Sequence, residues 1–291
     1  MNLPAAVDGE RHQVNERSGP LSYYVAGSGT PMVLLHSINA AASAYEVRPV
    51  FERMKQHYRV FAPDLPGFGF SDRSKRRYDV ELYTNAVLDM LDVVGEEQPK
   101  VPVDALALSL SSEFLARAAN LAPDRFRTLT FVTPTGFSRG SEKMTVPGQT
   151  REMRLLSGIL EFPLWRSALY NALVSRGSIR YFLKRTYGGP EVDEGMVDYD
   201  YLASHQPGAA NAPYSFLSGR LFSRDTRLLY EKLSVPVWVP HGTRGDFKDF
   251  SGAGWTRALE HWRFQPFDTG ALVHYERPEK FFESFDRHLG S

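Results

Sequence analysis

The stretch Val103–Ala119, VDALALSLSSEFLARAA, constrains the fold of this chain more than any other. It begins with the apolar run Ala105–Leu108, which is typical of a buried strand. After Ser109 the pattern changes, because apolar residues such as Phe114 and Ala118 now recur at helical spacing. The stretch therefore predicts a buried strand that passes directly into a helix.

Ser109 lies at this junction and is the candidate nucleophile. A serine on a sharp turn between a strand and a helix is the setting of a nucleophile elbow, whose strained turn needs small residues two positions before and after the serine. Here these residues are Ala107 and Ser111, not the commoner glycines. Taken alone, the pattern fits equally well an ordinary strand–helix junction with Ser112 near the helix N-cap.

Composition indicates an ordinary soluble globular protein. The 291 residues, 42% hydrophobic and 23% charged, suit one large α/β domain or a domain with an insertion. Lys+Arg and Asp+Glu both number 34, so net charge gives no reason to expect nucleic acid or a membrane as a partner. The absence of cysteine excludes disulfides and thiolate zinc sites. With no apolar run that suits a signal peptide or a membrane helix, we expect a cytoplasmic protein that acts on a small-molecule substrate.

Strand and helix patterns alternate along most of the chain, which predicts an α/β fold with a mostly parallel sheet covered on both faces. The alternation stops after Gly136, and only helix-like aromatic segments follow as far as Thr226. We therefore divide the chain into a core, residues 1–137 and 227–291, and an inserted helical cap, residues 138–226. The expected strands are Leu21–Ala26, Pro31–His36, Tyr58–Ala62, Ala105–Leu108, Phe126–Val132, Val235–Pro240 and Arg263–Phe267. The expected helices are Ala41–Met54, Val80–Val94, the one after Ser109, Met153–Tyr170, Ala172–Tyr187, Tyr214–Leu229, Trp255–Trp262 and Glu279–Leu289.

Four stretches, in the same order along the chain, resemble motifs of the α/β-hydrolase superfamily in its branch with a helical cap. Leu34–Asn39 is similar to the family's oxyanion loop, with Ser37 in place of a glycine. Ala62–Asp72 is close to a family pattern and is the most specific of the four. Ala107–Ser112 matches the elbow, and Val235–Asp246 is similar to the strand and turn that carry the catalytic acid. The resemblance implies an α/β-hydrolase fold, a serine nucleophile and neither cofactor nor metal. The stretches are LLHSIN (Leu34–Asn39), APDLPGFGFSD (Ala62–Asp72), ALSLSS (Ala107–Ser112) and VPVWVPHGTRGD (Val235–Asp246).

Within this resemblance, Ser109 is the nucleophile, and a serine at this position indicates acyl transfer through an ester-like intermediate. The backbone N–H of Leu110, at the start of the following helix, is suited to hold an oxyanion. The resemblance implies the N–H of Ile38 as the second donor. Asp246 is the expected acid, because it follows a predicted strand at the sheet's carboxyl edge, and Asp249 is the alternative.

The general base is missing from its usual place. The family has a histidine shortly after the last strand, with a proline seven residues later; Pro278 is present, but the histidine position holds Ala271. Three interpretations stay open. His274, three residues further on, supplies the base; or the site binds a small molecule without turnover; or Ala271 is an introduced substitution that disables the enzyme.

We expect two further polar residues to be structural: His36 to hydrogen-bond the oxyanion loop, and Asp64 to order its own turn. Aromatic cap residues are expected either to cover an apolar pocket over Ser109 or to pack the cap itself. The leading hypothesis is hydrolysis of an ester or related acyl bond in a small, largely apolar substrate, with a cofactor-free lyase as a further alternative. The aromatic cap residues for which these two roles are expected are Trp165, Tyr170, Tyr181, Phe182, Tyr187, Tyr214 and Phe216.

Overall fold

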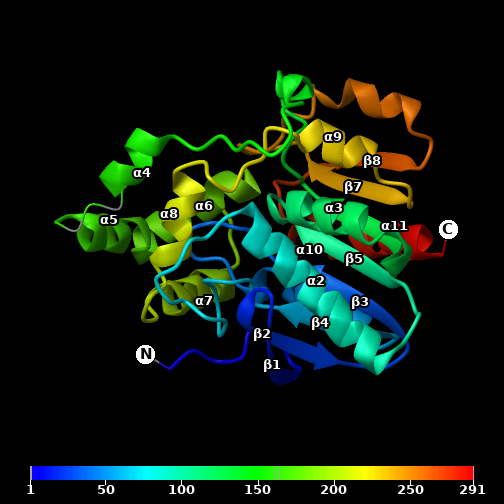
Figure 1. Cartoon of the computed structure of the whole chain (residues 1–291), viewed down its shortest axis with the longest axis horizontal. Helices are drawn as coiled ribbons and strands as arrows, with labels where there is room; N and C mark the ends of the chain where they lie inside the picture. Colours follow the sequence, from blue (N-terminus) through cyan, green and yellow to red (C-terminus); the bar gives the residue numbers. More distant parts are fainter. Residues whose placement is uncertain (1, 161, 163, 291) are drawn as a thin grey trace.

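The computed structural model describes residues 2–160, 162 and 164–290. In this part of the chain, eight strands form one sheet in the order β1-β2-β4-β3-β5-β6-β7-β8 (Figure 1). The pairs β1–β2 and β2–β4 are antiparallel, and the remaining neighbours are parallel, which confirms the predicted α/β class. The strands are β1 (Glu10–Glu16), β2 (Gly19–Ala26), β3 (Thr30–Leu35), β4 (Tyr58–Pro63), β5 (Val103–Leu108), β6 (Phe126–Val132), β7 (Val237–Gly242) and β8 (Trp262–Phe267).

The central strands are buried on both faces, which is why they are continuous apolar runs in the sequence. In β3, Val33 and Leu35 join one core cluster, whereas Met32 and Leu34 join the other. Side chains alternate across a strand, so each run of apolar residues supplies both layers of the core.

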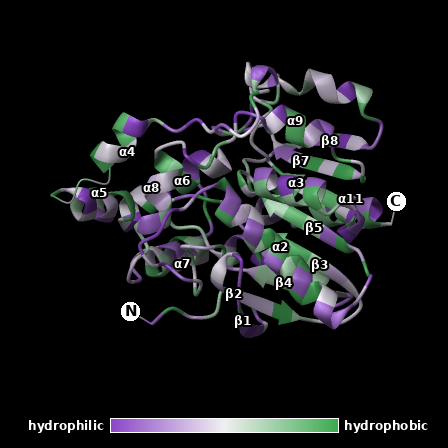
Figure 2. Cartoon of the chain, viewed as in Figure 1, coloured by the Kyte–Doolittle hydropathy of each residue, from purple (hydrophilic) through white to green (hydrophobic). Residues whose placement is uncertain are grey.

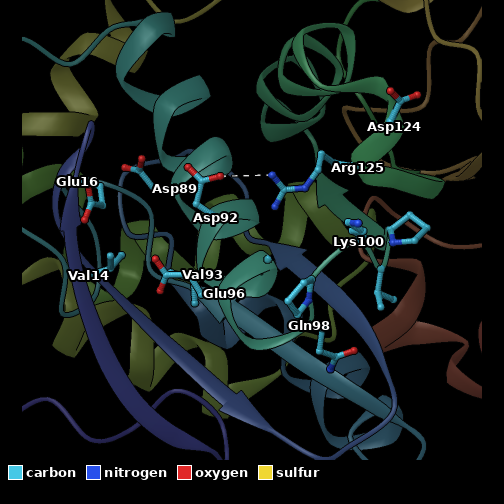
Figure 3. Close-up of a pocket in the computed structure, with 14 residues that line it drawn as sticks. Val14, Glu16, Asp89, Asp92, Val93, Glu96, Gln98, Lys100, Asp124 and Arg125 are labelled. Carbon is cyan, nitrogen blue, oxygen red and sulfur yellow. Dashed lines mark hydrogen bonds and ion pairs between the residues drawn. The ribbon is translucent and has the colours of Figure 1, made fainter.

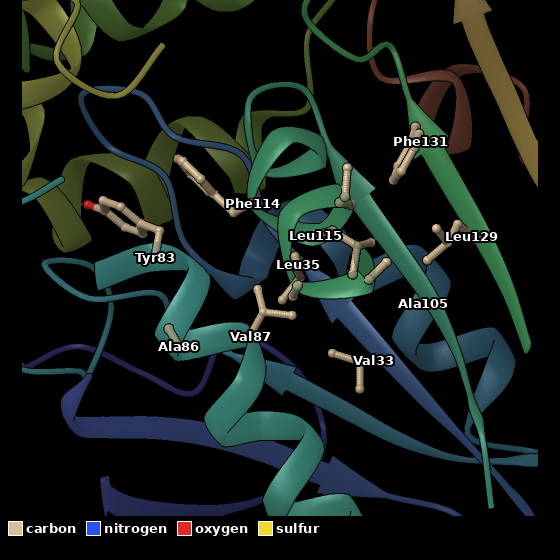
Figure 4. Packing of buried hydrophobic residues seen from close by; sticks show 14 of the residues in the cluster. Val33, Leu35, Tyr83, Ala86, Val87, Ala105, Phe114, Leu115, Leu129 and Phe131 are labelled. Atoms are coloured by element: carbon tan, nitrogen blue, oxygen red, sulfur yellow. The ribbon is translucent and has the colours of Figure 1, made fainter. Parts of the chain in front are cut away.

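Helices cover the two faces of the sheet. Those on the first face are α2 (Val80–Glu97) and α3 (Ser111–Leu121), and Tyr83 and Phe114 stack there with ring centroids 4.9 Å apart (Figure 4). Those on the second face are α1 (Arg48–Met54) and α11 (Pro278–Leu289), which contribute Phe51, Phe281 and Phe285 to the other cluster. Two short helices, α9 (Thr226–Glu231) and α10 (Val273–Glu276), and the 3-10 turns η1 (Ala44–Val47), η2 (Pro123–Arg125), η3 (Ser141–Lys143) and η4 (Ala253–Ala258) complete the described elements of this part.

A group of helices between β6 and β7 lies at one end of the sheet (Figure 1). Tyr170, Val174, Ala209 and Tyr214 form a small core of their own there. The helical character of this region agrees with a cap, while its boundaries at 137/138 and 226/227 remain a prediction. The helices are α4 (Arg154–Leu160), α5 (Arg166–Leu173), α6 (Arg176–Tyr187), α7 (Glu194–Ser204) and α8 (Asn211–Leu217). Among the described helices, none has the length and apolar character that crossing a membrane requires.

Several element boundaries differ from the expectation. The edge strand β1 was not predicted, because its residues are mostly exposed and polar and show no apolar alternation. The segment Tyr214–Leu229 forms two helices, α8 and α9, and Gly219 at φ 80° lies between them. The segment Met153–Tyr170 is likewise divided into α4 and α5. The helix expected over Trp255–Trp262 is absent from the described structure, because η4 ends at Ala258 and Trp262 begins β8. Helix α7 (Glu194–Ser204) was not predicted from the sequence.

Candidate active site

Ser109 occupies a sharp turn between β5 and α3. Its backbone φ is +50°, a left-handed conformation that costs a non-glycine residue about 1–3 kcal/mol. The turn is held because the Ser109 N–H donates to the carbonyl of Val132 on β6, at 3.0 Å. The buried hydroxyl of Ser111 donates to the carbonyl of His36, at 2.5 Å. The second small residue of the motif thus also ties the turn to the end of β3.

The loop after β3 is fixed by the carboxylate of Glu46. The carboxylate accepts the backbone N–H of Ser37 at 2.7 Å, the Ser37 hydroxyl at 3.0 Å and the Asn39 amide at 2.7 Å. Burial raises the pKa of Glu46, and the hydrogen bonds from Ser37 and Asn39 act in the opposite direction. Glu46 was not among the residues predicted from the sequence, where its one signal is a charged residue within an apolar run.

His36 also supports this loop. The N–H of Leu65 donates to His36 Nε2 at 2.9 Å, so the proton of the neutral ring lies on Nδ1, which donates to the carbonyl of Ser37 at 2.6 Å. Burial lowers the pKa of His36 to about 4. The structural role predicted for His36 is confirmed. The same holds for Asp64, whose carboxylate accepts backbone N–H groups within and beside its turn.

A cavity of about 150 Å³ contains the predicted oxyanion donors. Ser109, Ile38 and Leu110 all line it. Among the described residues, neither the N–H of Ile38 nor that of Leu110 has an acceptor. Two backbone donors beside a serine can hold the oxygen of a bound carbonyl group, which is the arrangement that oxyanion stabilisation needs.

Ala271 lines the same cavity. Its N–H donates to the carbonyl of Thr186 at 2.8 Å, and its carbonyl accepts the hydroxyl of Thr133 at 2.9 Å, so its backbone is fixed on both sides. The methyl group of Ala271 therefore lines the same cavity as Ser109, at the position where the resemblance leads us to expect a histidine.

His274 does not take the place of the missing base in this structure. Its ring is fully buried, and its Nε2 donates to the carbonyl of Glu46 at 2.8 Å. Its Nδ1 is buried without a hydrogen-bond partner among the described residues, and burial lowers the pKa of the ring to about 4. His274 lines neither of the two cavities that contain Ser109. The interpretation in which His274 faces Ser109 as its base does not agree with this structure, because α10 directs the ring toward η1 and Phe281.

Asp246 borders a second cavity with Ser109, of about 240 Å³. Its half-exposed carboxylate pairs with Arg185 of α6 at 2.5 Å. Asp249 lines this cavity too, and hydrogen bonds from Ser251 and from the N–H of Arg139 lower its pKa to about 2. Among the described residues, no histidine lines either of the two cavities that Ser109 borders.

A larger cavity, of about 630 Å³, lies away from Ser109 beside β1 and α2 (Figure 3). Its Asp89 and Asp92 carboxylates both pair with Arg17. Arg125 extends toward Asp92 from the opposite wall, at 3.4 Å. These charges are compensated within the protein, so the groove gives no indication of catalysis.

The fold and the elbow together define the class of this protein. The family model described as alpha/beta hydrolase fold matches residues 30–220, more than half of the chain, and the chain belongs to this family.

Among individual relatives, the 2-hydroxymuconate semialdehyde hydrolase of Pseudomonas putida is 24% identical over 246 residues, which cover 81% of this chain and 84% of that protein. The 2-hydroxy-6-oxo-2,4-heptadienoate hydrolase of Pseudomonas putida is 31% identical over 114 residues, covering 38% of this chain and 40% of that protein. The chain spans only 27% of the length of a matching protein of Mycobacterium tuberculosis.

Solved structures agree with the family. A serine hydrolase involved in carbazole degradation superposes with a TM-score of 0.75 at 18% identity, covering 97% of this chain and 99% of that one. The epoxide hydrolase CorEH gives 0.74 at 21% identity, covering 97% and 98%. At these identities the likeness shows the fold alone.

Proposed function

We propose that the Ser109 cavity binds a small, largely apolar carbonyl compound, and that the protein hydrolyses its ester or related acyl bond slowly. In this scheme the carbonyl oxygen lies against the N–H groups of Ile38 and Leu110, and Ser109 attacks the carbonyl carbon without help from an imidazole. The hydroxyl proton passes through water to the departing alcohol as its bond to the carbonyl carbon breaks, and a second water then cleaves the acyl–serine bond and releases the acid. The observation that carries the proposal is the combination of an intact elbow and two free backbone donors with the methyl group of Ala271.

The expected rate follows from the parts that remain. Loss of a triad member in serine hydrolases leaves about 10³–10⁴-fold acceleration over water, which comes from the oxyanion hole and from binding. We therefore place this protein between a full hydrolase and a binder without turnover. Relatives named as hydrolases of 2-hydroxymuconate semialdehyde and 2-hydroxy-6-oxo-2,4-heptadienoate make small oxo acids the first compounds to test. Arg151, which lines the second cavity, is a suitable partner for their carboxylate.

The test restores the missing side chain. We expect Ala271→His to raise the hydrolysis of p-nitrophenyl acetate at least about 100-fold, because a base then borders the nucleophile. The gain should vanish in the double variant with Ser109→Ala. Ala258→His, on an exposed part of η4, is the matched control for adding a histidine.

Two results would contradict the proposal. Equal hydrolysis by the parent and by Ser109→Ala would remove the serine from the reaction, and calorimetry with the oxo acids would then test the binder. No gain in Ala271→His, with an unchanged fold by circular dichroism, would mean that the missing imidazole does not limit the rate.

A further inference from the structure

Helices α4 and α5, together with described residues next to them, expose an unusual number of large apolar side chains. Leu155 is 85% exposed and Leu164 is 82% exposed. The two helices lie at the end of the molecule opposite the C-terminus (Figures 1 and 2). We call these residues the apolar tip: Met153, Leu155, Ile159, Phe162, Leu164, Trp165 and Leu169, each more than 40% exposed.

Some side chains of the apolar tip contact one another and the backbone. The rings of Phe162 and Trp165 lie 4.6 Å apart, and the indole N–H of Trp165 donates to the carbonyl of Ile159 at 2.9 Å. With its one polar group satisfied inside the protein, the exposed indole presents an apolar face. A concentration of exposed large apolar side chains on one part of a protein indicates a site of interaction with another molecule or with a membrane.

A cationic cavity of about 310 Å³ adjoins this surface. Its described lining residues are Lys75, Arg76, Arg166, Ser167, Asn211, Ser215 and Arg220. Four of these are cations and none is a carboxylate. Neighbouring carboxylates compensate part of this charge, since Arg220 pairs with Glu152 at 2.9 Å and Arg76 lies 3.6 Å from Asp72.

The charges of Lys75 and Arg166 remain uncompensated by a carboxylate within the described residues. Arg166 donates to the amide oxygen of Asn211 at 2.5 Å, which fixes its guanidinium without neutralising it. Arg76 Nη2 is buried and has no hydrogen-bond partner in the described part of the chain. The cavity thus has the charge and the donors that a phosphate group requires.

The cavity and the apolar tip meet at the start of α5, where Leu164 and Trp165 are followed directly by Arg166. Apolar and aromatic side chains next to uncompensated cations are the combination that binds the interface of an anionic bilayer. We propose that this end of the protein docks on an anionic phospholipid membrane, with a headgroup phosphate in the cationic cavity and the apolar tip at the acyl boundary.

An anionic membrane fits this end of the protein better than a second copy of the chain does. A two-fold dimer through the same face would bring Lys75 and Arg166 toward their own counterparts, and like charges repel. A bilayer with anionic headgroups instead offers opposite charge to the cavity and hydrocarbon to the tip. The docking is at the membrane surface, and it is independent of the function proposed for Ser109.

The experiment is co-sedimentation of the full chain with vesicles of phosphatidylcholine alone or of phosphatidylcholine mixed with phosphatidylglycerol. We expect binding to the mixed vesicles and much weaker binding to the neutral ones. The charge variant Lys75→Gln with Arg166→Gln should lower partition into mixed vesicles about 30-fold, since each cation near an anionic surface contributes about fivefold. The apolar variant Leu155→Ser with Leu164→Ser should lower it at least about tenfold.

Matched controls change the same chemistry elsewhere. Lys232→Gln with Lys280→Gln removes two exposed cations, and Leu121→Ser removes a leucine that is 65% exposed on the core. Both should bind mixed vesicles as the parent does. All variants alter exposed or half-buried side chains, and circular dichroism checks their fold.

Three outcomes would overturn the proposal: no binding to mixed vesicles, equal loss in controls and test variants, or a dimer in sedimentation that Leu155→Ser with Leu164→Ser dissociates. Calorimetry with inorganic phosphate distinguishes the source of the anion. Saturable phosphate binding that needs Lys75 and Arg166, without vesicle binding, would assign the cavity to a free anion and likewise overturn docking.

Discussion

At the scale of single residues, the loop after β3 depends on the buried carboxylate of Glu46, which has no part in the proposed reaction. Glu46 accepts three hydrogen bonds from Ser37 and Asn39, and its backbone carbonyl also accepts the one from His274. One residue therefore positions the loop that carries Ile38 and holds the histidine that the sequence suggested as the base.

Replacing this carboxylate should loosen the loop. We expect Glu46→Gln to lower the free energy of unfolding by about 1–3 kcal/mol, because its amide NH₂ would face donors that need an acceptor. Urea unfolding measures this effect, with the exposed Glu279→Gln on α11 as the control. An unchanged midpoint in Glu46→Gln would show that the loop does not depend on this carboxylate.

The buried His274 predicts a specific pH dependence. Its pKa is about 4 in the folded chain against about 6.5 when unfolded, so the unfolded chain binds more protons between these values. Stability contributed at this position is therefore complete above pH 6.5 and is lost as the pH falls toward 4. His274→Gln keeps a donor for the Glu46 carbonyl but does not titrate.

Urea unfolding from pH 7.5 to 4.5 should show the parent losing stability relative to His274→Gln by up to about 1.4 kcal/mol per pH unit below 6.5. The pKa of His36 is also lowered to about 4, but His36 is present in both proteins, so its contribution cancels. Parallel curves for the two proteins would contradict a buried, neutral His274.

At the scale of elements, the position of Ala271 follows from the close approach of two chain segments. Gly242 ends β7, and a Cβ built there would lie 2.0 Å from the carbonyl oxygen of Gly270. The absence of a side chain lets the segment after β8 lie against the end of β7, which brings Ala271 to the cavity wall.

We expect Gly242→Ala to cost at least about 1–3 kcal/mol in urea unfolding, because backbone atoms have to move to remove the clash. It should also abolish the gain in ester hydrolysis that Ala271→His produces. Gly158→Ala in α4 is the control: its Cβ meets nothing within 4 Å, and the change should be neutral or stabilising. A Gly242→Ala variant as stable as the parent would refute this account of the segment.

At the scale of the whole molecule, equal numbers of acidic and basic residues conceal a local excess of positive charge. The net charge is zero, yet Lys75 and Arg166 border a cavity whose described lining residues include no carboxylate. The expectation of no membrane partner rested on the net value, whereas the docking proposal rests on where the charges lie.

The dependence of vesicle binding on salt should show whether the local positive charge or only the apolar tip causes docking. We expect partition into mixed vesicles to fall severalfold when NaCl rises from about 0.05 to about 0.5 M, because screening shortens the range of the attraction. The variant Lys75→Gln with Arg166→Gln should show a weaker dependence on salt than the parent. Salt-independent binding would leave the apolar tip as its only cause and exclude the cationic cavity.

The sequence by itself determined the strand, elbow and helix around Ser109, since the periods of strands and helices are set by neighbours along the chain. It also determined the two-sided burial of strands such as β3, because a doubly buried strand needs a continuous apolar run. The resemblance of four stretches to family motifs, rather than these patterns, predicted the α/β-hydrolase family, to which the chain belongs.

Only the tertiary structure decided where His274 points, because its partner Glu46 lies 228 positions away in the chain. It also decided that Glu46 is buried and that the apolar tip is exposed, and both depend on which elements pack over them. Hydrogen bonds and burial between distant segments leave no period in the sequence. The elbow was therefore predictable, whereas the position of His274, buried against Glu46, became visible only in three dimensions.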